Sequence, residues 1–441
     1  MIGLRILWKS NAPHCGTGYG VQANSLLPRL AKHPAVEEIG IFGYYGIMGG
    51  MTDLPVGRGI PGVEPVTMRH YPMGNDTWGN DVVMEHAEHF KADVVITLMD
   101  AWVLNENYGH QGFRWVAYAP VDHEPIPPRV LDRLRRAYHV LAYSQHAQRE
   151  FTANGLDHSY IPHGIEKALY YPKKPDAKQK AREFLGFTDP NVFLMGTVAA
   201  NKGWPSRKGF PELFEAFKLF HERHDNARLF VHSQLIDHTG SSPPLLDVGR
   251  HFGIEEIVRF TKPHQDLIGF TTEEMCDLYN ALDVFVLPSM GEGFGIPLIE
   301  AQACGIPVIT SDWTATRELC GSGWLIEMGK KYLTQLLSYQ AFVSVESLLE
   351  QMENAYQAKE AGVLQGQMAV DAREFALQYD WETLIEERWF PFIDKLASDV
   401  TLRHIVPAPT FDAIPHMETS ESRDSAAGTA IRDEEGVPLG V

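Results

Sequence analysis

The sequence contains little cysteine and no long apolar run. Its 441 residues include four cysteines, Cys15, Cys276, Cys304 and Cys320, which are scattered without CxxC pairs or the spacing of zinc ligands. No apolar run is long enough to span a bilayer, and the start, MIGLRILWKS, lacks the apolar core and the cleavage site of a signal peptide. These absences predict a protein of the reducing cytoplasm.

The chain also lacks an excess of positive charge. It has 38 Lys and Arg residues against 57 Asp and Glu residues, which gives a formal net charge of −19, and this balance argues against a broad nucleic-acid-binding surface. No DxD, HExxH or Cys/His cluster suggests a catalytic metal. The apolar content is that of a globular protein, and the length suits two domains with additional segments.

Apolar runs typical of strands alternate with helical stretches along most of the chain. The first half contains LRILW, EIGIFGYY, DVVITLM, RWVAYAPV and VLAYS, and the second half contains VFLMGTVAA, ARLFVHSQL, IVRFT, DVFVLPS, IPVIT and GWLIE. This alternation predicts an α/β protein with two tandem, doubly wound parallel sheets. We expect a central cleft between the carboxyl ends of their strands, where such sheets bind ligands.

Composition shifts mark the expected boundaries. The prolines and polar residues of residues 160–176 indicate an interdomain linker. We therefore expect a first Rossmann-like domain over residues 1–175, a second over 176–375, a C-terminal helix over 376–400, and a polar, aperiodic, disordered tail over 401–441. The tract from Gly46 to Gly62 shows no pattern that predicts a structure.

Residues 283–312, DVFVLPSMGEGFGIPLIEAQACGIPVITSD, combine a buried strand, a glycine-broken turn, a short helix and a second strand. Gly291, Gly293 and Gly295 remove side chains at the turn, which lets backbone approach a ligand closely, and the following helix N-terminus favours a phosphate. Glu300, one turn into that helix, can accept hydrogen bonds from a ribose diol, whereas Glu292 would face the group beyond the phosphates. The alternative is that these residues only shape a tight turn.

The whole segment resembles the nucleotide-sugar motif of the retaining GT-B glycosyltransferases of family 4, written EGFGxPxxEAxAxGxPVI, and the resemblance extends over roughly residues 4 to 396. It implies a GT-B fold, a nucleoside-diphosphate sugar donor held by the second domain, and a terminal helix that crosses back to the first domain. It also implies a donor role for Gly293, Phe294, Gly295 and Glu300. Retention through same-face attack is likewise implied by the resemblance alone.

A basic loop follows the strand VFLMG. Lys202, Arg207 and Lys208 precede an amphipathic helix, PELFEAFKLF, and cations are needed where charge accumulates on a departing diphosphate. Family relatives place an Arg and a Lys here; Lys208 matches the Lys, while Lys202 and Arg207 both remain open as its partner. An ordinary exposed basic loop is the alternative.

A glycine-rich loop and an acidic segment follow two strands of the first half. GTGYG superficially looks like a dinucleotide fingerprint, but the expected acidic residue at the end of the second strand is missing. The family carries a glycine-rich loop here that faces the donor pyrophosphate and the acceptor, which implies that role for Gly16, Gly18 and Gly20.

Asp122 and His123 match a position that lines the acceptor side near the donor C6 hydroxyl, although simple turn chemistry before a proline is equally compatible.

The expected activity is therefore metal-independent, retaining transfer of a sugar from a nucleoside-diphosphate sugar to an unknown hydroxyl acceptor, which is a glycan, a lipid or a small molecule, without a further cofactor. An epimerase or phosphorylase of the same fold and a non-catalytic nucleotide-sugar-binding protein are the alternatives. Nucleic acid is an unfavoured acceptor because of the acidic charge. Arg129, Arg133 and Arg136 recur at helical spacing; such a basic face touches anionic lipid in some relatives, which leaves a peripheral membrane contact open beside the commoner solvated surface.

Overall fold

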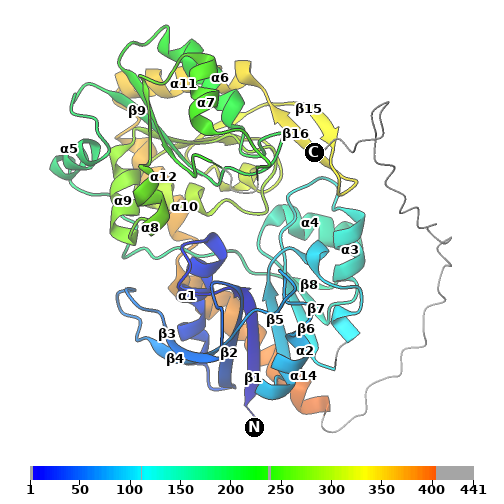
Figure 1. The fold of residues 1–441 in the computed structure, drawn as a ribbon. Coiled ribbons are helices and arrows are strands. Elements are labelled where there is room, and N and C mark those ends of the chain that lie inside the picture. The colour runs from blue at the N-terminus through cyan, green and yellow to red at the C-terminus, as the bar shows by residue number, and fades with distance from the viewer. Residues whose placement is uncertain (1–2, 111, 237–239, 404–441) are drawn as a thin grey trace, which may run out of the picture. The chain divides into compact units, whose positions relative to one another are not determined.

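A computed structural model describes residues 3–110, 112–236 and 240–403. It contains two large sheets joined by a chain segment without helix or strand between residues 161 and 174 (Figure 1). The α/β class and the two predominantly parallel sheets agree with the prediction. The predicted domain boundaries remain a prediction.

The first sheet has eight strands in the order β3-β4-β2-β1-β5-β6-β7-β8. Every pair along it is parallel except β3 and β4. The strands are β1 (Leu4–Asn11), β2 (Val36–Tyr45), β3 (Thr52–Val56), β4 (Val66–Tyr71), β5 (Val94–Leu98), β6 (Arg114–Tyr118), β7 (His139–Ala142) and β8 (His158–Tyr160). The sequence did not predict the three-residue strand β8, which lies outside the apolar runs, nor β3 and β4, which arise in and just after the glycine-rich tract that showed no periodicity. Their antiparallel pairing is a local hairpin at the sheet edge.

The second sheet has six parallel strands in the order β11-β10-β9-β12-β13-β14. They are β9 (Phe193–Val198), β10 (Ala227–His232), β11 (Val258–Phe260), β12 (Val284–Leu287), β13 (Val308–Ser311) and β14 (Gly323–Ile326). Five of the six lie inside runs that the sequence predicts to be strands, and β13 extends one residue beyond its run, to Ser311. A separate antiparallel hairpin, β15 (Met328–Leu333) and β16 (Tyr339–Val343), follows β14.

Helices cover the sheets in the order expected of alternating strands and helices. In the first half they are α1 (Gly18–Leu30), α2 (Val83–Phe90), α3 (Pro128–Leu134) and α4 (Gln145–Ala153), with short 3-10 turns at Ala101–Val103 and Tyr108–His110. In the second half they are α5 (Pro175–Phe184), α6 (Phe210–His221), α7 (Leu245–Phe252), α8 (Pro263–Ile268), α9 (Thr272–Ala281), α10 (Ile296–Ala303), a 3-10 turn at Thr316–Leu319, α11 (Val345–Glu360) and α12 (Gln367–Leu377). No helix among the described residues is long and apolar enough to cross a membrane.

The C-terminal helical segment packs on the first half of the chain. It comprises α13 (Trp381–Leu384), a π-helical turn (Ile385–Trp389) and α14 (Phe390–Arg403), and α14 is seen in orange beside the blue and cyan elements of the first sheet (Figure 1). The rings of Trp8 and Trp389 lie 6.0 Å apart, and Arg29 of α1 forms an ion pair of 2.9 Å with Glu382. These contacts join the segment to β1 and α1 of the first half.

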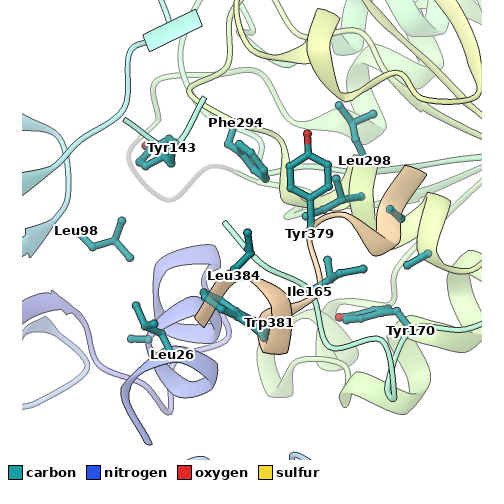
Figure 2. Close-up of a cluster of buried hydrophobic side chains, with 14 of the residues drawn as sticks. Leu26, Leu98, Tyr143, Ile165, Tyr170, Phe294, Leu298, Tyr379, Trp381 and Leu384 are labelled. Carbon is teal, nitrogen blue, oxygen red and sulfur yellow. The ribbon is translucent and has the colours of Figure 1, made fainter. Parts of the chain in front are cut away.

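One hydrophobic core runs continuously through both halves of the chain. Figure 2 shows Leu26 and Leu98 of the first sheet's layer in the same cluster as Leu298 of α10, with Tyr379, Trp381 and Leu384 among them. Burial of this much apolar surface couples the two halves.

Two features differ from the sequence predictions. The three arginines do not share a helix face, because α3 ends at Leu134 and Arg133 is buried, where its guanidinium donates to the Leu104 carbonyl at 2.9 Å. Helix α14 continues to Arg403, beyond the start expected for the tail at residue 401. The remainder of the predicted tail, 404–441, lies outside the described residues.

Candidate functional site

The glycine turn between β12 and α10 is shaped by contact with the first half of the chain. A Cβ atom on Gly291 would lie 2.2 Å from the Asp122 carbonyl oxygen, and one on Gly293 would lie 2.6 Å from Pro120 Cβ. The absent side chains thus allow the turn to pack against the residues that follow β6. The predicted close approach of a ligand to this backbone stays a prediction.

Gly295 and Pro297 set the start of α10. Gly295 is the N-cap at φ 124, a conformation that residues with a side chain rarely adopt, and Pro297 lies in the first turn, where its missing N–H has no intrahelical partner to lose. The free backbone N–H groups of this helix start therefore lie just beyond the carboxyl end of β12. This arrangement favours a negatively charged ligand.

Glu292 binds both cations that follow β9. Arg207 lies 3.1 Å from one carboxylate oxygen, and Lys208 donates to the other. Ser289 adds a hydrogen bond of 2.7 Å to the same carboxylate, and the Glu292 N–H donates to Thr314 Oγ1 at 2.9 Å. Glu292 is only 7% exposed. Both of its carboxylate oxygens and its backbone N–H are therefore bound within the protein.

The charges in this cluster shift one another's pKa. Burial alone would raise the pKa of Glu292, but Lys208 and Arg207 outweigh it and lower the pKa to about 2. Burial lowers the pKa of Lys208, and the Glu292 charge offsets only part of that effect. The site thus contains an ionised carboxylate between the Arg207 guanidinium and the Lys208 amine.

The structure distinguishes between the two candidates for the second cation. Arg207 reaches the Gly291 carbonyl at 2.6 Å and lies beside Lys208 on Glu292. Lys202 is exposed in the same loop, and no ion pair of Lys202 is found within the described residues. Arg207 and Lys208 are therefore the pair that this loop brings together.

Glu300 lies inside α10 and accepts a hydrogen bond of 2.7 Å from the Tyr279 hydroxyl of α9. Burial raises its pKa, and hydrogen bonds from Tyr279 and Tyr170 oppose part of that rise. The carboxylate keeps unused acceptor capacity, because each of its oxygens can accept more than one hydrogen bond.

Phe294 contributes to packing. Its ring lies 5.2 Å from His163 and 5.8 Å from Tyr379, and Figure 2 shows it among the buried side chains near Tyr143. Its side chain is 4% exposed. The ring is thus committed to the core, and only the backbone of Phe294 remains available for the predicted donor role.

The glycine-rich loop after β1 leads into α1, which begins at Gly18. Thr17 caps the helix by accepting from the Gly20 N–H. A Cβ on Gly18 would lie 3.5 Å from Ile296 Cδ1 at the start of α10, one on Gly20 would lie 2.4 Å from the Cys15 carbonyl, and one on Gly16 would meet nothing within 4 Å. The starts of α1 and α10 are therefore neighbours, and Gly20 is required by its own turn.

Asp122 and His123 follow β6 and face the cation pair. Asp122 lies 3.7 Å from Arg207 and accepts a hydrogen bond of 2.6 Å from His123 Nδ1. Burial would raise the pKa of Asp122, but this hydrogen bond and the Arg207 charge lower it. The other ring nitrogen of His123 lies 3.0 Å from Thr334 Oγ1, so both nitrogens are occupied within the protein.

Sequence reasoning missed Asp100, which lies two residues beyond the end of β5. Burial, together with the neighbouring charge of Asp122, raises its pKa to about 6. The signal was present, since a polar residue after a buried strand is the same pattern that singled out Asp122. The nearby His146 is buried, and its Nε2 lies 2.8 Å from the His123 carbonyl oxygen, so it has a packing role.

Taken together, Arg207, Lys208, Glu292, Asp122 and Asp100 lie at strand ends of both sheets. The cations and the start of α10 suit a diphosphate, Glu300 suits a diol, and the acidic pair suits hydroxyl groups. No group of three or more His, Cys, Asp or Glu residues that could hold a metal ion is found in the part of the chain described here.

Comparison with known proteins gives this site a context. Residues 190–342 match the family model described as Glycosyl transferases group 1. Mannosylfructose-phosphate synthase of Agrobacterium fabrum is 30% identical over 155 residues, which cover 34% of this chain and 32% of that protein. A GDP-mannose-dependent phosphatidylinositol monomannoside mannosyltransferase of Corynebacterium glutamicum is 28% identical over 38% of this chain and 43% of its own length. The matched region thus spans less than half of either relative.

Solved structures match over most of the chain. Sucrose-phosphate synthase from Thermosynechococcus elongatus superposes with a TM-score of 0.67 at 16% identity, covering 90% of this chain and 100% of that one. The Anabaena protein HepE in complex with UDP-glucose gives a TM-score of 0.59 at 17% identity, covering 91% and 99%. The chain therefore has the GT-B fold, and its segment from residue 190 to residue 342 matches the model of the group 1 glycosyl transferases.

Proposed function

We propose that this protein is a glycosyltransferase that moves a sugar from a nucleoside-diphosphate sugar to a hydroxyl acceptor, with retention of configuration and without a metal ion. The observation that carries the proposal is the Arg207–Glu292–Lys208 cluster at the start of α10. Its two adjacent cations suit the negative charge that the β-phosphate of a departing nucleoside diphosphate gains, and this supports the proposal.

Glu300 and the first-half carboxylates complete the assignment. Glu300 would accept from the donor ribose, and Asp122 and Asp100 would accept from hydroxyl groups of the transferred sugar or the acceptor. The similar mannosyltransferase is named for GDP-mannose and the similar Anabaena structure contains UDP-glucose, which supports a nucleoside-diphosphate hexose as donor.

The same cluster supports the proposal that no metal ion is needed. Arg207, Lys208 and the N–H groups at the start of α10 would stabilise the negative charge on the leaving diphosphate. A divalent metal ion stabilises this charge in other transferases. Support for retention is the resemblance of the segment from Glu292 to Glu300 to the family 4 motif.

The test is a transfer and hydrolysis assay with UDP-, GDP- and ADP-hexoses, with and without EDTA. We expect release of a nucleoside diphosphate that survives EDTA and a product that keeps the donor's anomeric configuration by NMR. Strict dependence on magnesium or manganese would refute the cation account, and an inverted product would refute retention. Donor binding without transfer or hydrolysis would point to a non-catalytic nucleotide-sugar-binding protein.

A further inference from the structure

The β15–β16 hairpin contacts the loop that carries Asp122. Tyr339 of the hairpin forms an isolated antiparallel bridge with Glu124, whose N–H donates to the Tyr339 carbonyl at 3.1 Å. Lys331 lies 3.8 Å from the Glu124 carboxylate, and Ser338 donates to the Pro125 carbonyl. A hairpin of the second half is therefore anchored at several points on a loop of the first half.

Within this contact, Thr334 at the hairpin turn holds His123. Its Oγ1 lies 3.0 Å from His123 Nε2 and 3.0 Å from the Ser338 carbonyl. An ionised Asp122 only accepts hydrogen bonds, so His123 Nδ1 must carry a hydrogen and donate to it. Nε2 then either accepts the Thr334 hydroxyl hydrogen or, when that hydrogen points to Ser338, donates to Oγ1. In both cases Thr334 fixes the ring.

His123 has no nitrogen left for a substrate, and it is only 4% exposed. Its remaining effect is on Asp122, whose second carboxylate oxygen lies 3.7 Å from Arg207. A chain of contacts thus runs from Thr334 through His123 to a carboxylate beside the cation pair. The imidazole transmits a position rather than taking part in bond making.

We propose that Thr334 is a positioning residue for sugar transfer, because it orients His123 and, through it, the Asp122 carboxylate beside Arg207. This inference rests on the proposed function. The β15–β16 hairpin would then keep the Asp122 side of the site in its active geometry. Loss of the Thr334 hydroxyl would leave His123 Nε2 without its partner and let the ring and Asp122 reorient.

The kinetic test uses Thr334→Val, which keeps the shape but removes the hydroxyl, and Thr334→Ser, which restores it. Gln335→Ala, at an exposed position on the same turn, is the matched control. We expect Thr334→Val to lower kcat about ten- to a hundredfold, the range that a small misplacement produces, with donor KM little changed. Thr334→Ser and Gln335→Ala should stay close to wild type. Wild-type kcat in Thr334→Val would overturn the proposal.

A double-mutant cycle separates positioning from general support of the fold. His123→Asn keeps a donor for Asp122 but does not extend to Thr334, so Thr334→Val should cause no further loss in that background. An equal loss in both backgrounds would show that Thr334 acts independently of His123 and would overturn the proposal.

A second readout does not depend on sugar transfer. In 15N-labelled free protein, the His123 Nε2 resonance should shift in Thr334→Val and remain near its wild-type position in Thr334→Ser. If the wild type transfers no sugar, the proposed function fails while this spectrum still reports whether Thr334 holds the imidazole. An unchanged His123 resonance in Thr334→Val would overturn the inference whatever the activity.

Discussion

The Arg207 guanidinium lies 3.1 Å from the Glu292 carboxylate, and the neighbouring Lys208 donates to the other oxygen of the same group. One buried carboxylate thus holds side by side two cations that would otherwise repel each other. The two residues are adjacent in the chain, and both side chains turn toward Glu292, while Arg207 also donates to the Gly291 carbonyl. Under the proposed function, this geometry would preorganise the loop after β9 for the diphosphate of the donor.

Arg207→Ala and Lys208→Ala should each lower turnover by about 10² to 10³, as expected when a group that meets developing charge is removed. Lys202→Ala, in the same loop but exposed, should remain within about twofold of wild type. Steady-state kinetics of nucleoside-diphosphate release measure all three. A large loss in Lys202→Ala with little in Arg207→Ala would reverse the assignment of the second cation.

Glu292→Gln should destabilise the folded protein in a pH-dependent manner. The folded-state pKa of Glu292 is lowered to about 2 from the ordinary 4.5, so its contribution is present above pH 4.5 and is lost as pH falls toward 2. At neutral pH the Glu292 charge therefore contributes about 3 kcal/mol to the free energy of unfolding. Urea denaturation at pH 7 and pH 3 measures it, with Glu215→Gln, an exposed site on α6, as control. Equal losses at both pH values would contradict the charge-based explanation.

Glu300→Ala should weaken nucleotide binding by about 1 to 3 kcal/mol, the usual loss for a hydrogen bond to a charged acceptor. Because the Tyr279 hydroxyl also donates to Glu300, Tyr279→Phe serves as a comparison that disturbs the carboxylate without removing it. Its effect should be smaller. Isothermal titration with the preferred nucleoside diphosphate measures both. Unchanged affinity in Glu300→Ala would remove the ribose assignment.

The sequence predicted the strands of both sheets well because parallel strands buried on two faces read as continuous apolar runs. Strands β3 and β4 were missed since Gly46 to Gly62 offers neither apolar alternation nor a typical turn signal. The predicted arginine face failed for a related reason: helical spacing does not reveal that α3 ends at Leu134, and a periodicity argument extends a helix past its real end.

Within the site, sequence reasoning located Glu292, Glu300 and Lys208 because each lies beside a strand or helix boundary in a distinctive motif. It left Arg207 and Lys202 open, since only the folded loop shows which side chain turns toward Glu292. It attributed the glycines at 291 and 293 to ligand approach, whereas the atoms that need the space belong to Pro120 and Asp122. Such contacts join distant parts of the chain and leave no local signal.

Asp100→Asn should stabilise the protein near neutral pH. Burial and the charge of Asp122 raise the pKa of Asp100 from 3.8 to about 6. The free energy of unfolding therefore falls as pH rises from 3.8 to 6, and the full loss remains above pH 6. Removing the charge should therefore raise the free energy of unfolding by about 2 to 3 kcal/mol at pH 7 and by little at pH 4. Asp225→Asn, at an exposed position, is the control. Activity should fall in Asp100→Asn if the carboxylate binds a hydroxyl group.

Lys9 of β1 is a fully buried, titratable side chain. Its Nζ lies 4.7 Å from the centre of the Tyr108 ring and 5.2 Å from that of Phe42, and no hydrogen-bond partner for Nζ is found among the described residues. Burial lowers its pKa to about 7, although the charges of Asp76 and Asp81 oppose the shift. The unfolded chain, with the ordinary value of 10.5, therefore binds more protons than the folded protein between pH 7 and 10.5. In that range the Lys9 contribution to the free energy of unfolding rises with pH.

Lys9→Met should accordingly be more stable than wild type at pH 7, and its advantage should shrink by about 3 kcal/mol between pH 7 and 9.5, because each pH unit in this window corresponds to about 1.4 kcal/mol. Urea denaturation of both proteins across the window gives the difference directly. Lys32→Met, at an exposed position after α1, should show no such trend. A constant difference between Lys9→Met and wild type would mean that Lys9 is in the same protonation state in the folded and unfolded protein, and that the two aromatic rings compensate the buried charge in full.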